Sequence, residues 1–233
     1  MSETRPTIVL VHGAFADASS WSGVIELLQR QGYTVVAPAN PLRGVKADSA
    51  YLASVVNQID GPALLVGHSY AGAVISDAAT DAPNVVGLVF VAAFAPDTDE
   101  RLGAVAATSK DSLLATAQVQ RRYPVGAGGE TAPEFADLPA DRAAMMAATQ
   151  RPIAAAAFSD PCGPPAWRKL PSWAVVATAD RAAGSDLVRS MAQRAGADIV
   201  EVEGSHVIMV SQPQAVLRVI VTAAGAVASP GDR

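Results

Sequence analysis

The stretch Pro62-Ala-Leu-Leu-Val-Gly-His-Ser-Tyr-Ala-Gly-Ala-Val-Ile75 decides how the rest of the chain is interpreted. Its first part, Ala63–Val66, is a short apolar run typical of a buried strand, and Gly72–Ala79 is small and apolar enough to form a helix packed on a sheet. Between them lies Gly67-His-Ser-Tyr-Ala71, in which a serine is flanked by small residues two positions away. This is the pattern of a nucleophile elbow, a strand-to-helix turn that projects the serine oxygen clear of the sheet. The stretch therefore predicts Ser69 as a nucleophile.

Composition limits the classes of protein to consider. The chain has 233 residues, half of them hydrophobic, and a net charge of −5, which suits one domain with a large core. The acidic balance excludes a basic nucleic-acid-binding surface. The single cysteine, Cys162, excludes an intrachain disulfide and is typical of a reducing compartment. The apolar run before His12 is too short for a signal peptide, and no run reaches the roughly 20 residues of a membrane span. We expect a cytoplasmic protein.

Strands and helices alternate over most of the chain. Short runs of aliphatic and β-branched residues predict six strands, at Thr7–Val11, Tyr33–Ala37, Ala63–Val66, Val85–Ala93, Ala174–Ala179 and Asp198–Val202. Helical patterns lie between and after them, at Ser20–Gln31, Asp48–Ile59, Gly72–Ala79, Ser185–Ala195 and Gln212–Ala226. Because each strand is a nearly continuous apolar run, we expect an α/β fold with a mostly parallel sheet of six strands and helices on both faces.

One segment interrupts this alternation. Residues 97–171 contain two helical patterns, Asp111–Arg121 and Asp141–Gln150, separated by stretches rich in proline and glycine. A structureless loop of this length is improbable in a compact domain. We therefore predict that residues 1–96 and 172–233 form the α/β core and that residues 97–171 form a small helical cap inserted between strands.

Residues suited to nucleophilic catalysis follow successive predicted strands. They are His12 after the first strand, Ser69 after the third, Asp97 after the fourth, Asp180 after the fifth and His206 just beyond the sixth. The carboxyl ends of parallel strands meet at one edge of a sheet, where such groups collect. A serine becomes a good nucleophile when a histidine accepts its proton, and that histidine must be oriented by a carboxylate.

The chain has three histidines, and only one suits the role of base. The ring of His68, which adjoins Ser69, is expected to point away from the serine oxygen. His12 belongs to the loop of the first strand. His206 lies in a glycine-flanked loop between the last strand and the last helix, and the order Ser69…Asp180…His206 is the one that the α/β-hydrolase arrangement uses. Asp180 is the preferred orienting acid, with Asp97 and Asp99 as alternatives.

Four motifs together resemble the α/β-hydrolase fold family: Thr7-Ile-Val-Leu-Val-His-Gly-Ala14, Val66-Gly-His-Ser-Tyr-Ala-Gly72, Thr178-Ala-Asp180 and Gly204-Ser-His206. The resemblance runs from about Thr7 to Ala226 and is to small bacterial members without metal or cofactor, a branch similar to plant esterases of the methyl-salicylate type. It implies that Ser69 is the nucleophile, that His206 is the general base and then the acid, and that Asp180 orients His206. It also implies that no cofactor is needed.

The same resemblance implies an oxyanion hole made of two backbone N–H groups. One belongs to Tyr70, directly after the nucleophile, and the second to Ala14, with Phe15 as the alternative. The sequence departs from the family pattern where Ala71 replaces the second elbow glycine and where Ala183-Gly184 follows Asp180 in place of an Ile-Pro pair. The few residues before the first strand predict the short form of the sheet, without two further antiparallel strands.

These observations predict a serine hydrolase that cleaves a small to medium carboxylic ester through an acyl-enzyme. Serine at position 69, in place of aspartate, argues against epoxide hydrolases and haloalkane dehalogenases. Val207 stands where related hydroxynitrile lyases carry a lysine. Three alternatives stay open: a cofactor-free perhydrolase or haloperoxidase, a lactone or thioester hydrolase, and a ligand-binding receptor that keeps a hydrolase pocket.

Large side chains near the predicted catalytic groups are candidate substrate contacts, namely Phe15, Trp21, Met145, Met146 and Trp167. No cluster of cysteines and histidines has metal-ligand spacing, so we expect no metal. The expected partner is a small-molecule ester, with no nucleic acid and no membrane. The sequence leaves the oligomeric state open between a monomer and a homodimer.

Overall fold

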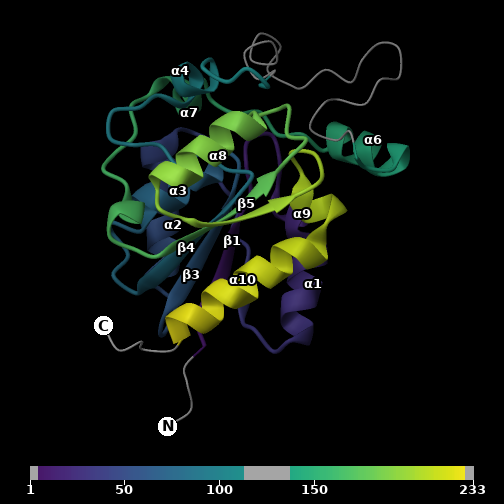
Figure 1. Cartoon of the computed structure of the whole chain (residues 1–233). Coiled ribbons are helices and arrows are strands. Elements are labelled where there is room, and N and C mark those ends of the chain that lie inside the picture. The colour runs from purple at the N-terminus through teal and green to yellow at the C-terminus, as the bar shows by residue number, and fades with distance from the viewer. Residues whose placement is uncertain (1–4, 113–136, 229–233) are drawn as a thin grey trace.

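The computed structural model describes residues 5–112 and 137–228. Within them, six strands form one sheet in the order β2-β1-β3-β4-β5-β6, and every neighbouring pair is parallel (Figure 1). The strands are β1 (Thr7–Val11), β2 (Val35–Val36), β3 (Ala63–His68), β4 (Val85–Val91), β5 (Ser172–Ala177) and β6 (Asp198–Val202). The predicted parallel sheet of six strands is therefore confirmed, and all six predicted strands are present.

Helices cover both faces of the sheet, as the apolar strands predict. On one face lie α2 (Val45–Val56), α3 (Ala71–Ala78) and α8 (Ser185–Arg194), and on the other lie α1 (Ser22–Arg30) and α10 (Pro213–Ala228). Figure 1 shows α1 and α10 side by side, where they pack against each other. Every residue of β1, β3 and β5 is buried, because these strands have helices above and below them. Their continuous apolar sequence follows from that position.

Several elements differ from the prediction at their ends; β4, for example, ends at Val91 rather than at Ala93. The edge strand β2 has two residues, because Pro38 and Pro41 follow it and a proline lacks the N–H that a ladder needs. Helix α2 begins at Val45 rather than at Asp48. Asp48 does not cap the helix, since its buried carboxylate accepts the N–H of Arg43 at 2.9 Å and the hydroxyl of Tyr70 at 2.7 Å.

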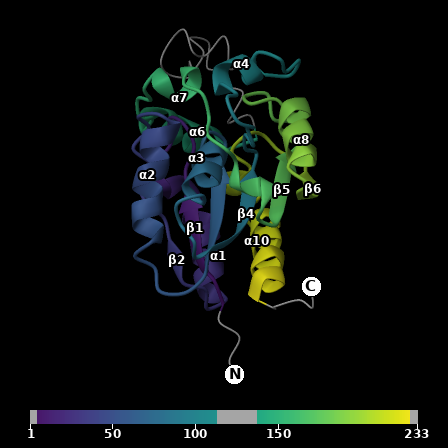
Figure 2. The same cartoon turned by 90° about the vertical axis from the view of Figure 1, so that its left-hand side faces the viewer.

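The remaining helices of the described residues are short. They are η1 (Ala18–Trp21), α4 (Leu102–Ala106), α6 (Ala140–Ala148), α7 (Ala156–Ser159), η4 (Ala166–Arg168) and α9 (Ile208–Ser211). Figure 2 shows α4 and α7 above the upper end of the sheet. The predicted helix Asp141–Gln150 corresponds to α6, whereas most of the predicted helix Asp111–Arg121 falls outside the described residues. The division into a core and a cap stays a prediction.

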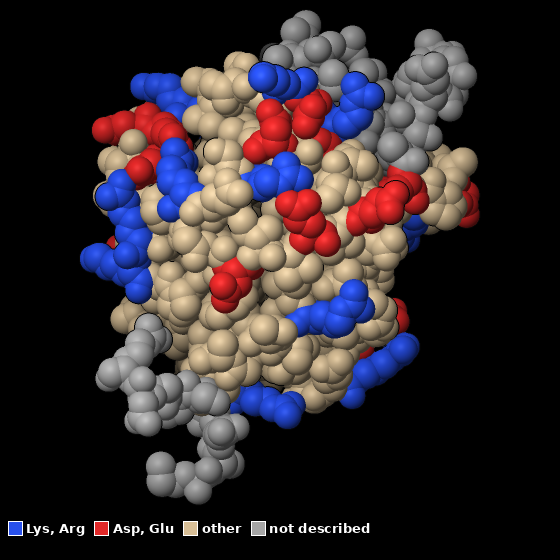
Figure 3. Space-filling view, viewed as in Figure 1, with Lys and Arg blue, Asp and Glu red and all other residues tan. Residues whose placement is uncertain are grey.

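Charged side chains are mixed on the face of the molecule that carries α8 and α10. Figure 3 shows lysines and arginines interspersed with aspartates and glutamates there. Several of them form exposed ion pairs, such as Arg189 with Glu201 and Arg194 with Glu100. Exposed pairs of this kind contribute little to stability.

Candidate active site

A strained turn after β3 presents Ser69. The serine has a backbone φ of 53°, in the left-handed region that non-glycine residues rarely occupy. Its carbonyl oxygen accepts the N–H of Gly72 at 3.0 Å and that of Phe94 at 3.2 Å, so α3 and the end of β4 both hold the turn. This is the elbow that the sequence predicts.

Two glycines allow the turn to close. A Cβ atom at Gly67 would lie 2.7 Å from the carbonyl oxygen of Ala71, and one at Gly72 would collide with the carbonyl oxygen of Phe94. Both neighbours are backbone atoms that cannot rotate away. Ala71 itself is buried and tolerated. The second small position of this elbow is therefore Gly72, which explains the departure from the family pattern at Ala71.

Three side chains from distant parts of the chain form a hydrogen-bonded series. The imidazole Nε2 of His206 lies 2.8 Å from Ser69 Oγ, and its Nδ1 lies 2.8 Å from Asp180 Oδ2. All three residues are buried, with at most 7% of their surface exposed. A carboxylate only accepts hydrogen bonds, so Nδ1 of His206 carries the proton and Nε2 accepts the hydrogen bond of the serine hydroxyl. The arrangement can move a proton from the hydroxyl to the imidazole.

Backbone groups hold the carboxylate in place. Asp180 Oδ1 accepts the N–H groups of Ala182 at 2.9 Å and Ala183 at 3.0 Å, in the turn between β5 and α8. The other oxygen is left for His206. The carboxylate of Asp97, the alternative acid, forms an ion pair with Arg168 at 2.6 Å instead. The backbone N–H of Asp99, the other alternative, donates to the carbonyl of Cys162. The structure brings Asp180, and neither alternative, to His206.

His12 stabilises the loop that follows β1. Its Nδ1 donates to the carbonyl of Gly13 at 2.9 Å, and its Nε2 accepts the N–H of Asn40 at 2.9 Å. The Asn40 side chain returns a hydrogen bond to the His12 carbonyl at 3.1 Å. Burial lowers the pKa of His12 more than the hydrogen bond to Gly13 raises it, so the ring is neutral. His12 therefore orders the loop and does not reach Ser69.

The loop after His12 passes directly beside the nucleophile. A Cβ atom at Gly13 would lie 2.8 Å from both Ser69 Cβ and His68 Nδ1, so a larger residue has no room there. Within the described residues, the backbone N–H groups of Ala14 and Tyr70 form no hydrogen bond with the protein. The carbonyl of Phe15 accepts the N–H of Arg151 at 2.9 Å. Ala14 and Tyr70 thus flank Ser69 with amides available to a ligand.

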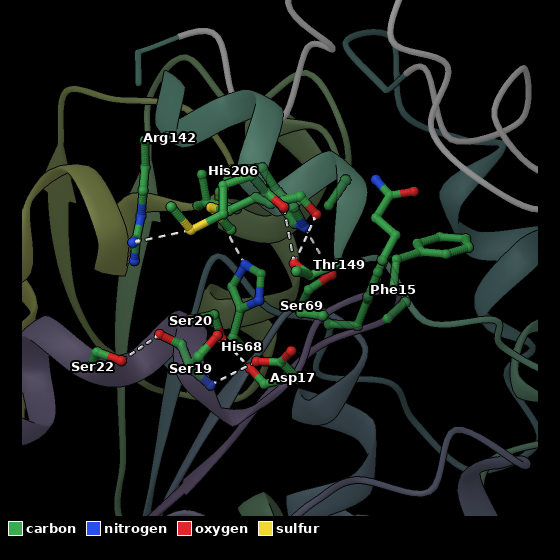
Figure 4. A pocket seen from close by; sticks show the side chains of 18 of the residues that line it. Phe15, Asp17, Ser19, Ser20, Ser22, His68, Ser69, Arg142, Thr149 and His206 are labelled. Atoms are coloured by element: carbon green, nitrogen blue, oxygen red, sulfur yellow. Dashed lines mark hydrogen bonds between the residues drawn. The ribbon is translucent and has the colours of Figure 1, made fainter. Parts of the chain in front are cut away.

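A cavity of about 220 Å³ opens in front of Ser69 and His206 (Figure 4). One part of its wall is apolar and consists of Ala14, Phe15, Phe94, Met145, Met146, Phe158 and Val207. The other part is polar and consists of Asp17, Ser19, Ser20, Ser22, Arg142, Thr149 and Gln150. In Figure 4, Arg142 and Ser22 lie on one side of Ser69 and Phe15 on the other. The wall of the cavity therefore combines apolar and polar side chains, and Arg142 contacts Met145.

The comparisons with known proteins agree with this fold. A model of the alpha/beta hydrolase family matches residues 8–219. The chain belongs to the alpha/beta hydrolase family. A pyrethroid hydrolase from Sphingobium wenxiniae is 33% identical over 104 residues, which are 39% of this chain and 36% of that relative. The matched part thus spans about a third of the relative's length.

Solved structures of alpha/beta hydrolases superpose on nearly the whole chain. An extracellular alpha/beta-hydrolase from a Paenibacillus species has a TM-score of 0.75 at 22% identity, covering 94% of this chain and 98% of its own. A pyrethroid hydrolase from Sphingobium faniae has a TM-score of 0.76 at 21% identity, covering 99% and 100%. Polyneuridine aldehyde esterase has a TM-score of 0.77 at 19% identity, covering 94% and 99%. At these identities the likeness establishes the fold.

Two of the predicted substrate contacts lie away from the cavity of this alpha/beta hydrolase. Trp21 is fully buried beneath the site, with its ring edge-on to His68 at 6.5 Å, because it faces the core shared by α1 and α10. Trp167 packs beside the other core cluster and donates its indole N–H to the carbonyl of Pro96 at 3.0 Å. Phe15, Met145 and Met146 do line the cavity.

No sequence motif marks the polar part of the cavity wall. Ser19 and Ser22 belong to η1 and the start of α1, and their only signal was their closeness in sequence to Ala14. In the described parts of this alpha/beta hydrolase, no group of three or more histidine, cysteine, aspartate or glutamate side chains is arranged to hold a metal ion. No helix within the same parts is long and apolar enough to cross a membrane.

Proposed function

We propose that this alpha/beta hydrolase cleaves a small to medium carboxylic ester through an acyl-enzyme on Ser69. The observation that carries the proposal is the series of hydrogen bonds from Ser69 Oγ through the His206 imidazole to Asp180. A serine hydroxyl becomes nucleophilic when a neighbouring base takes its proton as the bond to carbon forms. His206 is placed to do this, and Asp180 holds the tautomer that the transfer requires.

The reaction has two steps. Ser69 Oγ attacks the ester carbonyl while His206 Nε2 accepts the hydroxyl proton, and the imidazolium is stabilised by Asp180. His206 then gives this proton to the leaving alcohol, and the acyl group stays on Ser69. In the second step water attacks the acyl-enzyme, His206 accepts the water proton, and the acid is released as the serine recovers its proton.

The negative charge of each tetrahedral intermediate needs fixed donors. The N–H groups of Ala14 and Tyr70 flank Ser69, and each such donor contributes about 3–4 kcal/mol to the stabilisation of the transition state. Tyr70 also precedes α3, whose N-terminal end carries a partial positive charge. Its side chain points away from the site and is anchored on Asp48, so only its backbone faces the ester.

Two further observations support an ester as the substrate. The cavity wall contains aromatic and methionine side chains beside the reactive serine, which suits an uncharged carbonyl compound with apolar arms. The similar proteins include a pyrethroid hydrolase and polyneuridine aldehyde esterase, whose names describe hydrolysis. We extend this general chemistry, and not their particular substrates, to the present chain.

The test is acylation of Ser69 by an activated ester. When 4-nitrophenyl butyrate is mixed with the enzyme in stopped flow, nitrophenolate should be released in a rapid burst and then at a slower steady rate. Mass spectrometry of acid-quenched protein should find the butyryl group on Ser69. Ser69→Ala should give neither. Ser76→Ala is the matched control, because Ser76 is also a buried serine, on α3, and should react as wild type does.

The outcomes separate the alternatives. Turnover that persists in Ser69→Ala would refute the proposed nucleophile. Saturable binding of the ester without any Ser69-dependent release of nitrophenolate would instead favour a ligand receptor that keeps a hydrolase pocket.

A further inference from the structure

A second cavity adjoins the first one. It has a volume of about 730 Å³, and two residues line both cavities, namely Phe15 and Phe158. Phe15 comes from the loop after β1 and Phe158 from α7, and only 5% and 9% of their surfaces are exposed. Two buried aromatic rings thus separate the space in front of Ser69 from a larger space beneath the short helices.

We propose that Phe15 and Phe158 form a partition that limits the length of the apolar arm of the substrate, and that the second cavity is a subsite for a long unbranched hydrocarbon arm when the partition is opened. This inference rests on the proposed function for the reaction itself. It goes further because it assigns a chain-length limit to two particular side chains.

The backbone around the partition is fixed. The carbonyl of Phe15 accepts the N–H of Arg151 at 2.9 Å, and Ala154, two residues after Pro152, donates its N–H to the carbonyl of Leu42 at 2.9 Å. The Phe158 ring also lies 6.1 Å from the ring of Tyr70, in a tilted contact. These contacts hold the backbone on both sides of the partition and one face of the Phe158 ring.

The chemistry of the second cavity suits hydrocarbon. Most of its wall is apolar and comes from Gly103, Ala104, Pro152, Ile153, Ala154 and Ala155. The charged side chain among its lining residues is that of Arg101, whose guanidinium donates to the carbonyl of Ser159. Arg142 and Ser22 of the first cavity lie on the far side of Ser69 from Phe15 (Figure 4). An apolar arm directed toward Phe15 therefore runs away from the cationic side chain of Arg142 and toward a mostly apolar wall.

Chain-length preference measures the partition directly. Each methylene group that moves from water into an apolar site is worth about fourfold in affinity. We would compare kcat/KM for 4-nitrophenyl acetate, butyrate, octanoate and dodecanoate in the wild type and in Phe158→Ala. The ratio of kcat/KM for dodecanoate to that for butyrate should rise at least about tenfold in the variant, which corresponds to two buried methylene groups. An unchanged ratio would overturn the proposal.

Phe158 is the residue to change, because Phe15 adjoins the proposed oxyanion donor Ala14 and has a positive φ of 61°. Ile153→Ala is the matched control, since Ile153 lines only the second cavity, and it should leave the ratio as in wild type. Adding Ala155→Trp to Phe158→Ala should fill the second cavity from an exposed position and reverse the gain. A gain that survives this filling would show that the chain goes elsewhere. Phe158→Leu, a smaller change, replaces Phe158→Ala if the latter does not fold.

A binding measurement separates this inference from the proposed function. In a Ser69→Ala background, calorimetry with 1-hexanol and 1-dodecanol requires no turnover. Phe158→Ala should tighten the binding of dodecanol relative to hexanol by about tenfold or more. If the wild type hydrolyses no ester, the proposed function fails, whereas this ratio still decides the role of the partition. If the wild type cleaves esters but Phe158→Ala changes neither the kcat/KM ratio nor the binding ratio, the proposed partition is refuted while the proposed function stands.

Discussion

His68 donates its Nε2 proton to the backbone carbonyl of His206 at 3.0 Å, and the two imidazole rings lie 4.7 Å apart. Nδ1 of His68 is then unprotonated, and within the described parts of the chain this buried atom has no hydrogen-bond partner. Burial, and secondly the neighbouring His206, holds the pKa of His68 well below its usual value. A neutral His68 allows His206 to take up a proton in the reaction without a second positive charge beside it.

The first prediction concerns this contact. In His68→Leu, the His206 carbonyl loses its donor, which should lower the free energy of unfolding by about 1–3 kcal/mol and lower kcat about tenfold because His206 is less well held. In His68→Gln, the side-chain amide can still donate, so kcat should recover most of that loss. Thermal melting and kcat for the two variants check this. Equal kcat in both variants would show that the hydrogen bond does not position His206.

The second prediction concerns acid stability. Burial lowers the folded-state pKa of both His12 and His68, whereas the unfolded value is about 6.5. Between the folded and unfolded values, the unfolded chain binds protons that the folded protein does not, so stability rises with pH in that range. The free energy of unfolding should therefore be highest above about pH 6.5. On acidification it should fall by up to about 1.4 kcal/mol per pH unit for each histidine. Urea unfolding at about pH 7.5 and about pH 5 should show a smaller difference for His68→Gln than for wild type.

Local signals account for much of what the sequence predicts. The prediction of Ser69 rests on a strand, a tight turn and a helix that are contiguous in the chain, and that of His206 on elimination among three histidines. Apolar runs mark the central strands because these are buried on both faces. The edge strand β6 is the weaker case, since most of its residues are exposed, and it still appears at the predicted residues Asp198–Val202.

Side-chain direction is harder to predict from the sequence. The sequence favours Asp180 over Asp97 without excluding Asp97, and the packing shows that Asp97 turns outward to Arg168 while Asp180 faces His206. Trp21 and Ser22 are neighbours, and the rotation of the helix places the tryptophan in the core and the serine at the cavity. Phe158 approaches Phe15 across a long separation in sequence, which no local pattern reveals.

The third prediction tests the orienting acid. Asp180→Asn should lower kcat by about 10⁴ with a nearly unchanged fold, because an amide in place of the carboxylate favours the wrong tautomer of His206. Asp97→Asn is the matched control and should stay close to wild type, since its partner Arg168 is 56% exposed and an exposed pair contributes at most about 1 kcal/mol. Steady-state kinetics on a 4-nitrophenyl ester measures both. A larger loss for Asp97→Asn would transfer the role to that residue.

The fourth prediction concerns the strain at the elbow. Ser69→Gly and Ser69→Ala should both be inactive, yet the glycine variant should be more stable than the alanine variant by about 1 kcal/mol. The reason is that glycine adopts the observed φ of 53° without strain, which costs a residue with a Cβ atom about 1–2 kcal/mol. Chemical unfolding of the two variants measures the difference. Equal or lower stability of Ser69→Gly would show that the turn stores no strain of this kind.

The last prediction tests why glycine stands at position 72. A Cβ atom at Gly72 would collide with the carbonyl oxygen of Phe94, and neither α3 nor the end of β4 can move without disturbing Ser69, whose own carbonyl binds both segments. Gly72→Ala should therefore lower the free energy of unfolding by about 1–3 kcal/mol or more and lower kcat as well.

Gly225→Ala on α10 provides the comparison. Nothing lies within 4 Å of the added carbon there, so the higher helix propensity of alanine should raise the stability by about 1 kcal/mol and leave kcat as in wild type. For a chain of this size these changes correspond to shifts in Tm of about 2–4 °C per kcal/mol, in opposite directions. If both substitutions raised Tm, the close approach of α3 to the end of β4 would not be what requires glycine at the elbow.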